Sequence, residues 1–343
     1  MKAIIQEAFG APSEVLRLGD IRVPAIGPNE VLVRVRATAV AKGDWLIAQG
    51  LPYIARLSYG IRSPKHQVAG LEFAGVVEKV GAAVTRFTPG DEVVGWGNEA
   101  LAEYVAVSQD QLLAKPSAIG FDQAAALPVS GFAALQAVRD QGEVTAGDRV
   151  LVIGASGGVG SFAVQVAKAL GAEVTGVAST RNLELVRRLG ADHVVDYTTE
   201  GIGDGGRRFD VIIDIAGNRP LAELRRVLEP DGTLVIVGGS GRRATMGFGR
   251  TIRAALLSPF VGQRLRALIS KPNTVDLETL VEFAEAGQLT AEVGANYPLE
   301  QAAAAVDLVG DGPSRGKTVV TIQDNSRISR TDHQIDSSSR RDN

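Results

Sequence analysis

The chain has 343 residues, of which 45% are hydrophobic and 22% charged, so it is long enough for two domains with sizeable cores. The formal net charge of −3, without a basic block before the polar C-terminus, argues against nucleic-acid binding. The absence of cysteine excludes disulfides, thiolate metal sites and cysteine nucleophiles. Charges or glycines interrupt every apolar run, and the N-terminus lacks the apolar region of a signal peptide, so we expect a cytoplasmic protein without a membrane span.

Residues 1–120 form the β-rich part of the chain. Short apolar runs alternate there with turn signals such as Gly27-Pro28-Asn29 and Pro89-Gly90-Asp91, a pattern typical of a small barrel or sandwich. The predicted strands are Met1–Gln6, Glu30–Ala37, Ala74–Val80, Asp91–Trp96 and Leu101–Val107.

Residues 121–258 change to a rhythm of alternating strands and helices. The predicted strands are Arg149–Ile153, Glu173–Val177, His193–Asp196, Asp210–Asp214 and Thr233–Val237. The predicted helices are Asp122–Leu127, Phe132–Val138, Ser161–Leu170, Asn182–Leu189 and Pro220–Leu228. This alternation predicts an α/β fold with a doubly wound parallel sheet.

The C-terminal part, residues 259–323, is mostly helical in pattern. It contains the predicted helices Glu278–Ala286 and Glu300–Val309 and ends on the strand Thr318–Ile322, which is long enough to rejoin the first domain. Residues 324–343 are polar and almost free of apolar residues, so we expect a disordered tail.

A glycine-rich segment joins the strand at Arg149–Ile153 to the helix that follows it. Gly157 lets the main chain approach a pyrophosphate, Gly160 lets the helix pack on the strand, and the N–H groups of the first helical turn face the anion. Ala155 replaces the first glycine of the usual motif, and the alternative is a tight turn without a ligand. The predicted dinucleotide-binding residues of this segment are Ala155, Ser156, Gly157, Gly158, Val159 and Gly160.

The end of the next strand favours NADPH over NADH. An NAD site needs a carboxylate there for the ribose hydroxyl, whereas a 2′-phosphate needs hydroxyls and a cation. The segment reads Ser179, Thr180, Arg181, and the acid of this strand, Glu173, lies at its beginning. Ser179 and Thr180 could donate hydrogen bonds to a phosphate and Arg181 could pair with it. Capping of the next helix is the alternative role for the same residues.

Several motifs together resemble the quinone oxidoreductase-like branch of the medium-chain dehydrogenase/reductase superfamily. The resemblance spans residues 1–322 and rests on Gly27–Val33, Gly70–Val77, Pro89–Val93, Gly154–Gly160, Ser179–Asn182, Leu189–Tyr197 and Arg315–Lys317. It implies a GroES-like catalytic domain formed by residues 1–120 and 259–323 around a Rossmann NADP-binding domain at residues 121–258. It also implies an active site in the cleft between these domains, and a homodimer.

The zinc-binding residues of related dehydrogenases are absent. The segment where a ligand cysteine would fall reads Ala39–Asp44, and the place of the Gly-His-Glu signature reads Gly70-Leu71-Glu72. His66, His193 and His333 lie far apart in the sequence, whereas a zinc site needs about three converging ligands. We therefore expect no catalytic metal.

The expected reaction follows from the missing Lewis acid. Oxidising an unactivated alcohol is difficult without a metal, whereas a conjugated carbonyl already stabilises the enolate that hydride addition produces. The sequence favours hydride transfer from NADPH to a small electrophile, a quinone or an α,β-unsaturated carbonyl. The alternatives are an NADP-dependent alcohol dehydrogenase and an NADPH-binding protein without turnover.

The segment Ala41–Tyr53 is expected to be a loop that lines the substrate cleft. Lys42, Trp45 and Tyr53 are the candidate substrate residues, with Lys42 or Tyr53 donating to the carbonyl oxygen. Packing is the alternative for both aromatic residues, and exposure to solvent is the alternative for Lys42. The arginine-rich stretch Arg242–Arg266 is interpreted as a lid, an apolar wall, a subunit interface or a solvated helix face.

Further cofactor contacts are implied by position in the family pattern. Ser130 is expected near the nicotinamide or the phosphates, and Tyr197 near the adenine-side phosphate. Gly217 and Gly238 close two strand ends at which a doubly wound sheet binds ligands, although both could serve only as turns. Lys317 could reach the cofactor or have a structural role.

Overall fold

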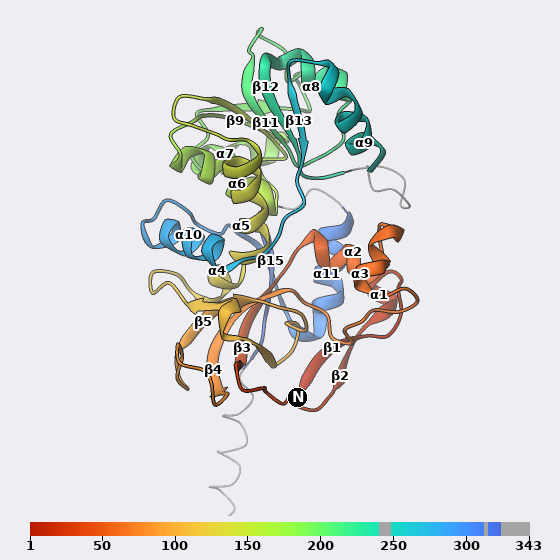
Figure 1. The fold of residues 1–343 in the computed structure, drawn as a ribbon, viewed down its shortest axis with the longest axis vertical. Helices are drawn as coiled ribbons and strands as arrows, with labels where there is room; N and C mark the ends of the chain where they lie inside the picture. Colours follow the sequence, from red (N-terminus) through yellow and green to blue (C-terminus); the bar gives the residue numbers. More distant parts are fainter. Residues whose placement is uncertain (240–247, 312–314, 324–343) are drawn as a thin grey trace, which may run out of the picture.

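Two β-sheets, one above the other along the long axis of the molecule, organise the chain (Figure 1). The computed structural model describes residues 1–239, 248–311 and 315–323. The helices are α1 (Pro12–Val15), α2 (Lys42–Gln49), α3 (Arg56–Tyr59), α4 (Phe121–Ala125), α5 (Pro128–Leu135), α6 (Gly158–Ala169), α7 (Leu183–Arg188), α8 (Leu221–Val227), α9 (Phe248–Leu257), α10 (Thr274–Glu285) and α11 (Ala302–Asp311).

The upper sheet is parallel and has six strands in the order β10-β9-β8-β11-β12-β13. Their bounds are β8 (Arg149–Ile153), β9 (Glu173–Ala178), β10 (His193–Asp196), β11 (Phe209–Asp214), β12 (Leu228–Ile236) and β13 (Arg264–Ala267). Successive residues of a strand point to opposite faces. Val150 and Val152 accordingly join the hydrophobic core that contains Phe162 of α6, whereas Leu151 and Ile153 join the core that contains Leu224 of α8. Both faces are thus covered by helices, which confirms the doubly wound sheet.

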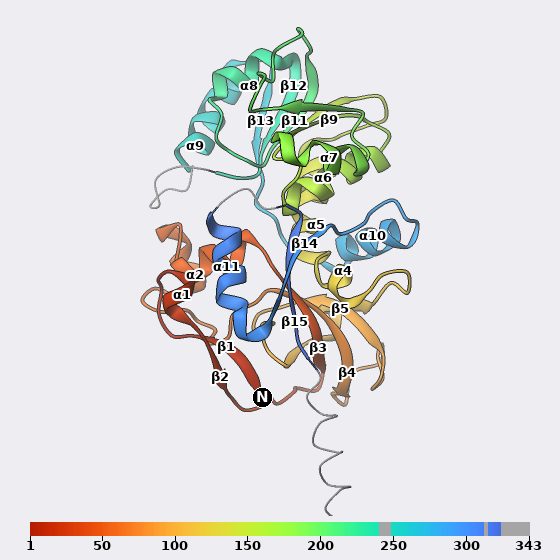
Figure 2. The ribbon, with the colours of Figure 1, turned by 180° about the vertical axis from the view of Figure 1, so that it is seen from behind.

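The lower sheet has the strand order β14-β15-β3-β4-β5-β7, with β6 also paired to β3 and a separate pair β1-β2. The bounds are β1 (Lys2–Gln6), β2 (Leu16–Asp20), β3 (Glu30–Val40), β4 (Glu72–Val80), β5 (Glu92–Trp96), β6 (Tyr104–Ser108), β7 (Leu112–Ala114), β14 (Val293–Pro298) and β15 (Lys317–Thr321). The C-terminal strand β15 runs antiparallel to β3, with Thr318 opposite Val40. Strands from the N-terminal and the C-terminal parts of the chain therefore build this sheet, as Figure 2 shows from behind.

One predicted loop is a helix. Ala41–Tyr53 was expected to be irregular, but α2 occupies Lys42–Gln49. The Asp44 carboxylate accepts a hydrogen bond from the Ala41 N–H at 2.8 Å, and Gly50 ends the helix in a left-handed conformation with φ +64°. Both are ordinary capping devices, so the sequence carried a signal that the loop prediction overlooked.

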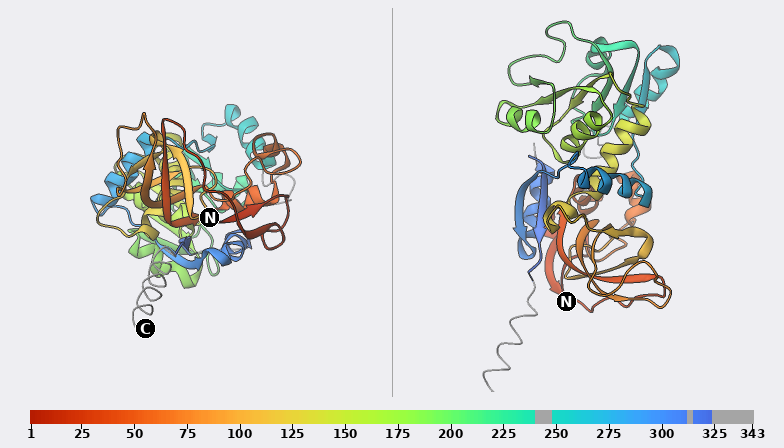
Figure 3. Two further views of the ribbon diagram at one scale, coloured as in Figure 1. Left: turned by 90° about the horizontal axis from the view of Figure 1, so that it is seen from below. Right: turned by 90° about the vertical axis from the view of Figure 1, so that its left-hand side faces the viewer.

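The strand β13 leads us to propose a later end for the nucleotide-binding domain than the sequence suggested. It lies beyond residue 258, where the predicted nucleotide-binding segment ends, and it pairs in parallel with β12. A strand belongs with the sheet that it hydrogen-bonds to, so we propose that this domain extends to Ala267. At the other boundary, α4 packs against β3 and β4, while α10 packs against α5; the side view in Figure 3 shows these helices between the sheets.

The predicted disordered tail, residues 324–343, lies outside the described residues. Within the described ranges, no helix has the length and apolarity that crossing a bilayer requires.

Candidate functional site

A cleft of about 1200 Å³ lies between the two sheets and draws its walls from both. The upper wall contains the glycine segment Ser156–Val159 and residues at the carboxyl ends of β9, β11 and β12. A doubly wound sheet binds ligands at this edge because the strand ends and helix N-termini meet there. The lower wall comes from β3, α2 and the neighbourhood of β5.

The glycine segment holds α6 close against β8. A Cβ placed on Gly160 would lie 2.0 Å from the carbonyl oxygen of Gly154, so only glycine fits this contact. No side chain caps the N-terminus of α6, whose N-cap residue is Gly157. The N–H groups of an uncapped first turn attract an anion. The geometry therefore supports the predicted dinucleotide-binding loop, with Ala155 and Gly160 buried beneath it and Ser156, Gly157, Gly158 and Val159 on the cleft wall.

Two predicted residues from other elements meet this loop. A Cβ on Gly158 would lie 3.3 Å from Cδ of Lys317 and 3.5 Å from Oγ of Ser130, so both side chains adjoin the loop. The N–H of Gly316 donates to the carbonyl oxygen of Ser156 at 2.8 Å, which ties the beginning of β15 to the glycine segment. The lower sheet thus contributes a cation to the cleft beside the glycine segment.

Lys317 takes part in a buried ion pair. Its Nζ donates to Oε1 of Glu72 at 2.6 Å and to Oγ of Ser130 at 3.0 Å. The side chains of Lys317 and Glu72 are 1% and 0% exposed. The N–H of Val129 donates to the other Glu72 oxygen at 2.6 Å. Burial nevertheless raises the pKa of Glu72 to about 7, against the opposing effect of Lys317.

Asp44 is a second buried carboxylate on which the charge of Lys317 acts. One of its oxygens accepts the Ala41 N–H, and the other, Oδ1, is buried without a hydrogen-bond partner in the part of the chain that the structure describes. Burial raises the pKa of Asp44 to about 6. The sequence prediction mentioned Glu72 and Asp44 only where metal ligands are missing. The pairing of Glu72 with Lys317 was overlooked because it joins residues far apart in the chain.

Only some of the residues predicted to contact the adenine end of NADPH line the cleft. Ser179 and Tyr197 line the cleft, whereas Thr180 and Arg181 do not form part of the described wall. The Thr180 hydroxyl donates to Oδ2 of Asp196 at 2.5 Å. Asn182, which the prediction did not include, is buried and donates to the Ser156 hydroxyl at 3.2 Å, so it joins this strand end to the glycine segment.

Gly217 and Gly238 allow two strand ends to approach each other. A Cβ on Gly217 would lie 2.5 Å from the Gly238 oxygen, and a Cβ on Gly238 would lie 1.9 Å from the Ile215 oxygen. Gly238 lines the cleft and Gly217 does not. Close backbone packing therefore accounts for both glycines, and Gly238 is also placed to contact a ligand.

The three predicted substrate residues are not brought together. Lys42 lines the cleft, and its Nζ donates to the Gly310 oxygen at 2.7 Å while lying 4.0 Å from the centre of the Trp45 ring. Trp45 is 8% exposed and packs in the lower core, whereas Tyr53 is 56% exposed and stacks with Arg56. The structure places neither aromatic residue in the cleft wall.

The cleft also has an apolar wall that the sequence prediction missed. Its core is Trp96, whose ring meets Phe132 edge-on at 5.4 Å between centroids. The apolar side chains of this wall are Val40, Leu46, Pro52, Leu71, Trp96, Phe132 and Val309. Apolar residues from five separate segments carry no motif, which is why only the fold reveals them.

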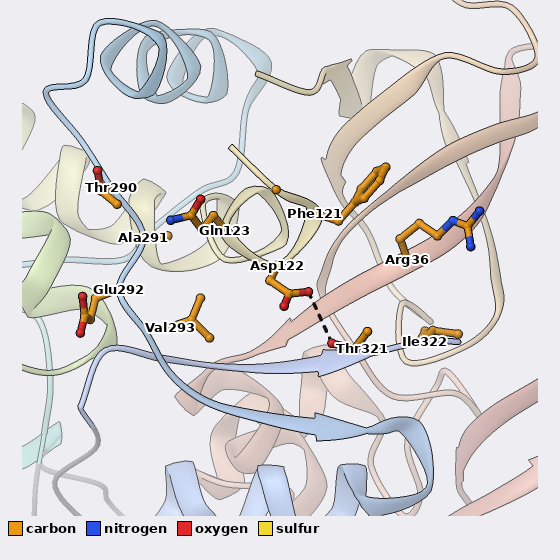
Figure 4. Close-up of a pocket in the computed structure, with 11 residues that line it drawn as sticks. Arg36, Phe121, Asp122, Gln123, Thr290, Ala291, Glu292, Val293, Thr321 and Ile322 are labelled. Carbon is orange, nitrogen blue, oxygen red and sulfur yellow. Dashed lines mark hydrogen bonds between the residues drawn. The ribbon is translucent and has the colours of Figure 1, made fainter. Parts of the chain in front are cut away.

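A second cavity, of about 790 Å³, lies beside α4 and β15 (Figure 4). Asp122 and Thr321 point toward each other there, and the Thr321 hydroxyl donates to Oδ1 of Asp122 at 3.4 Å. No residue of the predicted site lines this cavity. We therefore assign the candidate function to the cleft between the sheets.

Among the described residues, no three histidine, cysteine, aspartate or glutamate side chains come together in a way that could hold a metal ion. The expected zinc independence stays a prediction.

Comparison with known proteins agrees with this architecture. Residues 27–117 match the alcohol dehydrogenase GroES-like domain, and residues 189–320 match the family described as zinc-binding dehydrogenase. The quinone oxidoreductase of Sus scrofa is 32% identical over 340 residues, covering 94% of this chain and 98% of that protein. The chloroplastic NADPH-dependent alkenal/one oxidoreductase of Arabidopsis thaliana is 38% identical over 257 residues, covering 70% and 63% of the two chains.

A solved structure extends the likeness to three dimensions. The quinone oxidoreductase of Coxiella burnetii superposes with a TM-score of 0.82 at 32% identity, covering 94% of this chain and 99% of that one. Both the predicted fold class and the resemblance drawn from the motifs are confirmed. The protein is an oxidoreductase that belongs to the quinone oxidoreductase-like branch of the medium-chain dehydrogenase/reductase family.

Proposed function

We propose that this protein reduces a quinone or an α,β-unsaturated carbonyl compound with NADPH and without a catalytic metal. The observation that carries the proposal is the composition of one continuous cleft. An uncapped helix N-terminus with Lys317 beside it forms one part of the lining, and apolar side chains around Trp96 form another. The first suits a dinucleotide pyrophosphate and the second an uncharged, conjugated substrate.

The residues present fit the cofactor. Gly158 leaves a space beside Lys317 and Ser130 that a Cβ would enter, and the first turn of α6 opens onto the same space. We propose that this loop, Ser130 and Lys317 hold the pyrophosphate, with Tyr197, Gly238 and Ser179 along the rest of the dinucleotide. When bound, NADPH supplies the hydride.

The chain supplies orientation, a water-poor cavity and a hydrogen bond. The apolar wall excludes water and holds the conjugated system near the reacting end of the dinucleotide. Lys42, which lines the cleft and donates to the Gly310 oxygen, is our candidate donor to the carbonyl oxygen of the substrate. Solvent can protonate the enolate, so the proposal requires no dedicated acid.

Preference for NADPH over NADH rests on the end of β9. No acid stands at that strand end, and Ser179, Thr180 and Arg181 follow it. The neighbouring acid, Asp196, has its carboxylate occupied by the hydroxyls of Thr180 and Thr198. We propose that Arg181 pairs with the 2′-phosphate; Arg181→Ala should then weaken NADPH binding about tenfold and leave NADH binding unchanged. Equal losses for both cofactors would contradict this role.

The test of the reaction uses a panel of quinones, 2-alkenals, enones and simple alcohols. We expect oxidation of NADPH with members of the first three groups, and no reduction of NADP⁺ by the alcohols. Activity with the alcohols alone would favour the alternative of an alcohol dehydrogenase. Binding of NADPH without oxidation by any compound would favour a non-catalytic binding protein. Loss of activity to a chelator would contradict zinc independence.

Two further predictions remain proposals. β13 is an edge strand whose hydrogen-bonded partner among the described residues is β12, so a second copy could extend the sheet there into a homodimer. A mass in solution equal to one chain would contradict this. A cytoplasmic location is consistent with the absence of cysteine, and imaging of the tagged protein would test it.

A further inference from the structure

The buried pair Glu72–Lys317 faces the anion-binding end of the cleft. Lys317 lines the cleft wall, whereas Glu72 lies behind it and is fully buried. Lys317 has three N–H donors; two are directed to Glu72 and Ser130, at 2.6 and 3.0 Å. The same ammonium group therefore neutralises a buried carboxylate and adjoins the loop where a pyrophosphate would bind.

The charged groups around Glu72 come from two elements. Lys317 on β15 lowers the pKa of Glu72, and Asp44 on α2 raises it. From α5, the N–H of Val129 donates to its carboxylate. One ammonium group thus serves two buried carboxylates even before any ligand arrives. Such a cluster has no positive charge to spare for a bound anion.

We propose that Lys317 exchanges its counterion when the cofactor binds, and that Glu72 takes up one proton from solvent as the pyrophosphate arrives. This inference rests on the proposed cofactor site. The step forms one O–H bond on a Glu72 carboxylate oxygen and moves no electron. It leaves the cluster with Lys317 facing the pyrophosphate and Glu72 neutral. Glu72 is therefore a positioning residue that acts through Lys317.

The burial of Glu72 and the negative charge of the arriving pyrophosphate make this exchange favourable. Because burial already brings the pKa of Glu72 to about 7, a small further increase is enough to protonate it near neutral pH. The arriving negative charge supplies that increase, since like charges in a poorly solvated site favour the protonated form.

The proposal predicts how cofactor binding depends on pH. At about pH 6 the free protein already holds the proton on Glu72, so binding takes up little, whereas at about pH 8 it takes up close to one proton. Above the pKa of the free protein, affinity for NADPH should fall by up to about tenfold per pH unit.

Titration calorimetry of the full chain with NADPH tests this. Repeating the titration in buffers of different ionisation enthalpy gives the number of protons taken up. The 2′-phosphate also titrates, so the diagnostic quantity is the difference between the wild type and Glu72→Gln, which keeps the shape of the side chain. We expect the variant to lose the uptake at about pH 8 and to bind with an affinity that changes little with pH.

A second variant distinguishes the two carboxylates. Asp44→Asn removes a charge that raises the pKa of Glu72, so uptake should persist but shift to lower pH. Uptake that Asp44→Asn abolishes and Glu72→Gln retains would overturn the proposal. Equal proton counts in the wild type and Glu72→Gln would overturn it too. If Glu72→Gln does not fold, an uptake by the wild type that fails to rise between about pH 6 and 8 overturns it. Absence of NADPH binding would overturn the cofactor site itself, a result distinct from binding without proton uptake.

Discussion

The two parts of the cleft lining that we propose for the cofactor and for the substrate, called the nucleotide end and the substrate end below, use different parts of the polypeptide. The nucleotide end is built from main chain, with the first turn of α6 and tightly packed glycines around it, and from a single ammonium group. The substrate end is built from apolar side chains of several elements. The first must keep its backbone geometry and its charge, whereas the second can change shape residue by residue. Cofactor binding should therefore be the more fragile property, and substrate preference the more adjustable one.

Substitution of the two cleft lysines is the strongest test of the difference between the two ends. Lys317→Ala should weaken NADPH binding about a hundredfold and lower the free energy of unfolding by about 3–5 kcal/mol, because it leaves Glu72 buried without its partner. Lys42→Ala is the matched control at the substrate end. It should change NADPH affinity less than about twofold and act on the catalytic step with enones.

Fluorescence titration and chemical denaturation of both variants measure these effects. Similar losses of NADPH affinity in the two variants would remove the distinction between the two ends.

Substitutions at two glycines of the same loop distinguish a role in packing from a role in ligand binding. Gly160→Ala should cost about 3 kcal/mol of stability because the methyl group collides with the Gly154 oxygen. The methyl group of Gly158→Ala meets the side chains of Lys317 and Ser130 at 3.3 and 3.5 Å and the Gly316 oxygen at 3.7 Å. The fold should tolerate these contacts, while NADPH affinity falls about tenfold. Thermal unfolding and NADPH titration of the pair provide the measurements. A stable Gly160→Ala protein would contradict the packing role of that glycine.

The buried acid at the nucleotide end should also make stability depend on pH. The pKa of Glu72 is about 7 in the folded protein against a usual 4.5, so the native state keeps its proton to higher pH than the unfolded chain does. This contribution to the free energy of unfolding is full below the usual pKa and is lost as pH rises through about 7, a change of about 3 kcal/mol. Comparing denaturation of the wild type and Glu72→Gln from acidic to alkaline pH isolates it. Parallel curves for the two proteins would refute the raised pKa.

The smallest expected effect is that of a substitution in the apolar wall. Leu46→Ala should raise KM for an enone about fivefold through lost apolar contact, with NADPH affinity unchanged within about twofold. Steady-state kinetics at saturating NADPH measures the first quantity and titration the second. A loss of NADPH affinity comparable with the change in KM would place Leu46 at the wrong end of the cleft.

The sequence was sufficient to predict the strand, turn and helix around the glycine segment because local chemistry determines them. β8 and β10 have the bounds predicted from the sequence, and the glycine segment leads into α6 as its turn chemistry requires. Such features depend on neighbours in the chain, so a pattern reveals them.

The substrate end could not be predicted in the same way. Trp96 and Phe132 meet only because α5 packs against β5 in the folded chain. The buried pair beside the glycine segment was missed for the same reason, because Glu72 and Lys317 are 245 positions apart. Trp45 was chosen for its chemistry and its place before Tyr53, but packing in the lower core takes up its ring. A pattern states which residues are apolar or charged, and only the tertiary fold decides which of them share a cavity.

The most direct test of the proposed reaction follows the hydride itself. NADPH carrying deuterium at its reactive carbon is incubated with the protein and a 2-alkenal or enone, and the product is examined by NMR and mass spectrometry. We predict one deuterium on the β-carbon of a saturated carbonyl product, from one face of the cofactor only. Deuterium on the carbonyl carbon of an allylic alcohol, or a reduced product without deuterium, would contradict the proposed function.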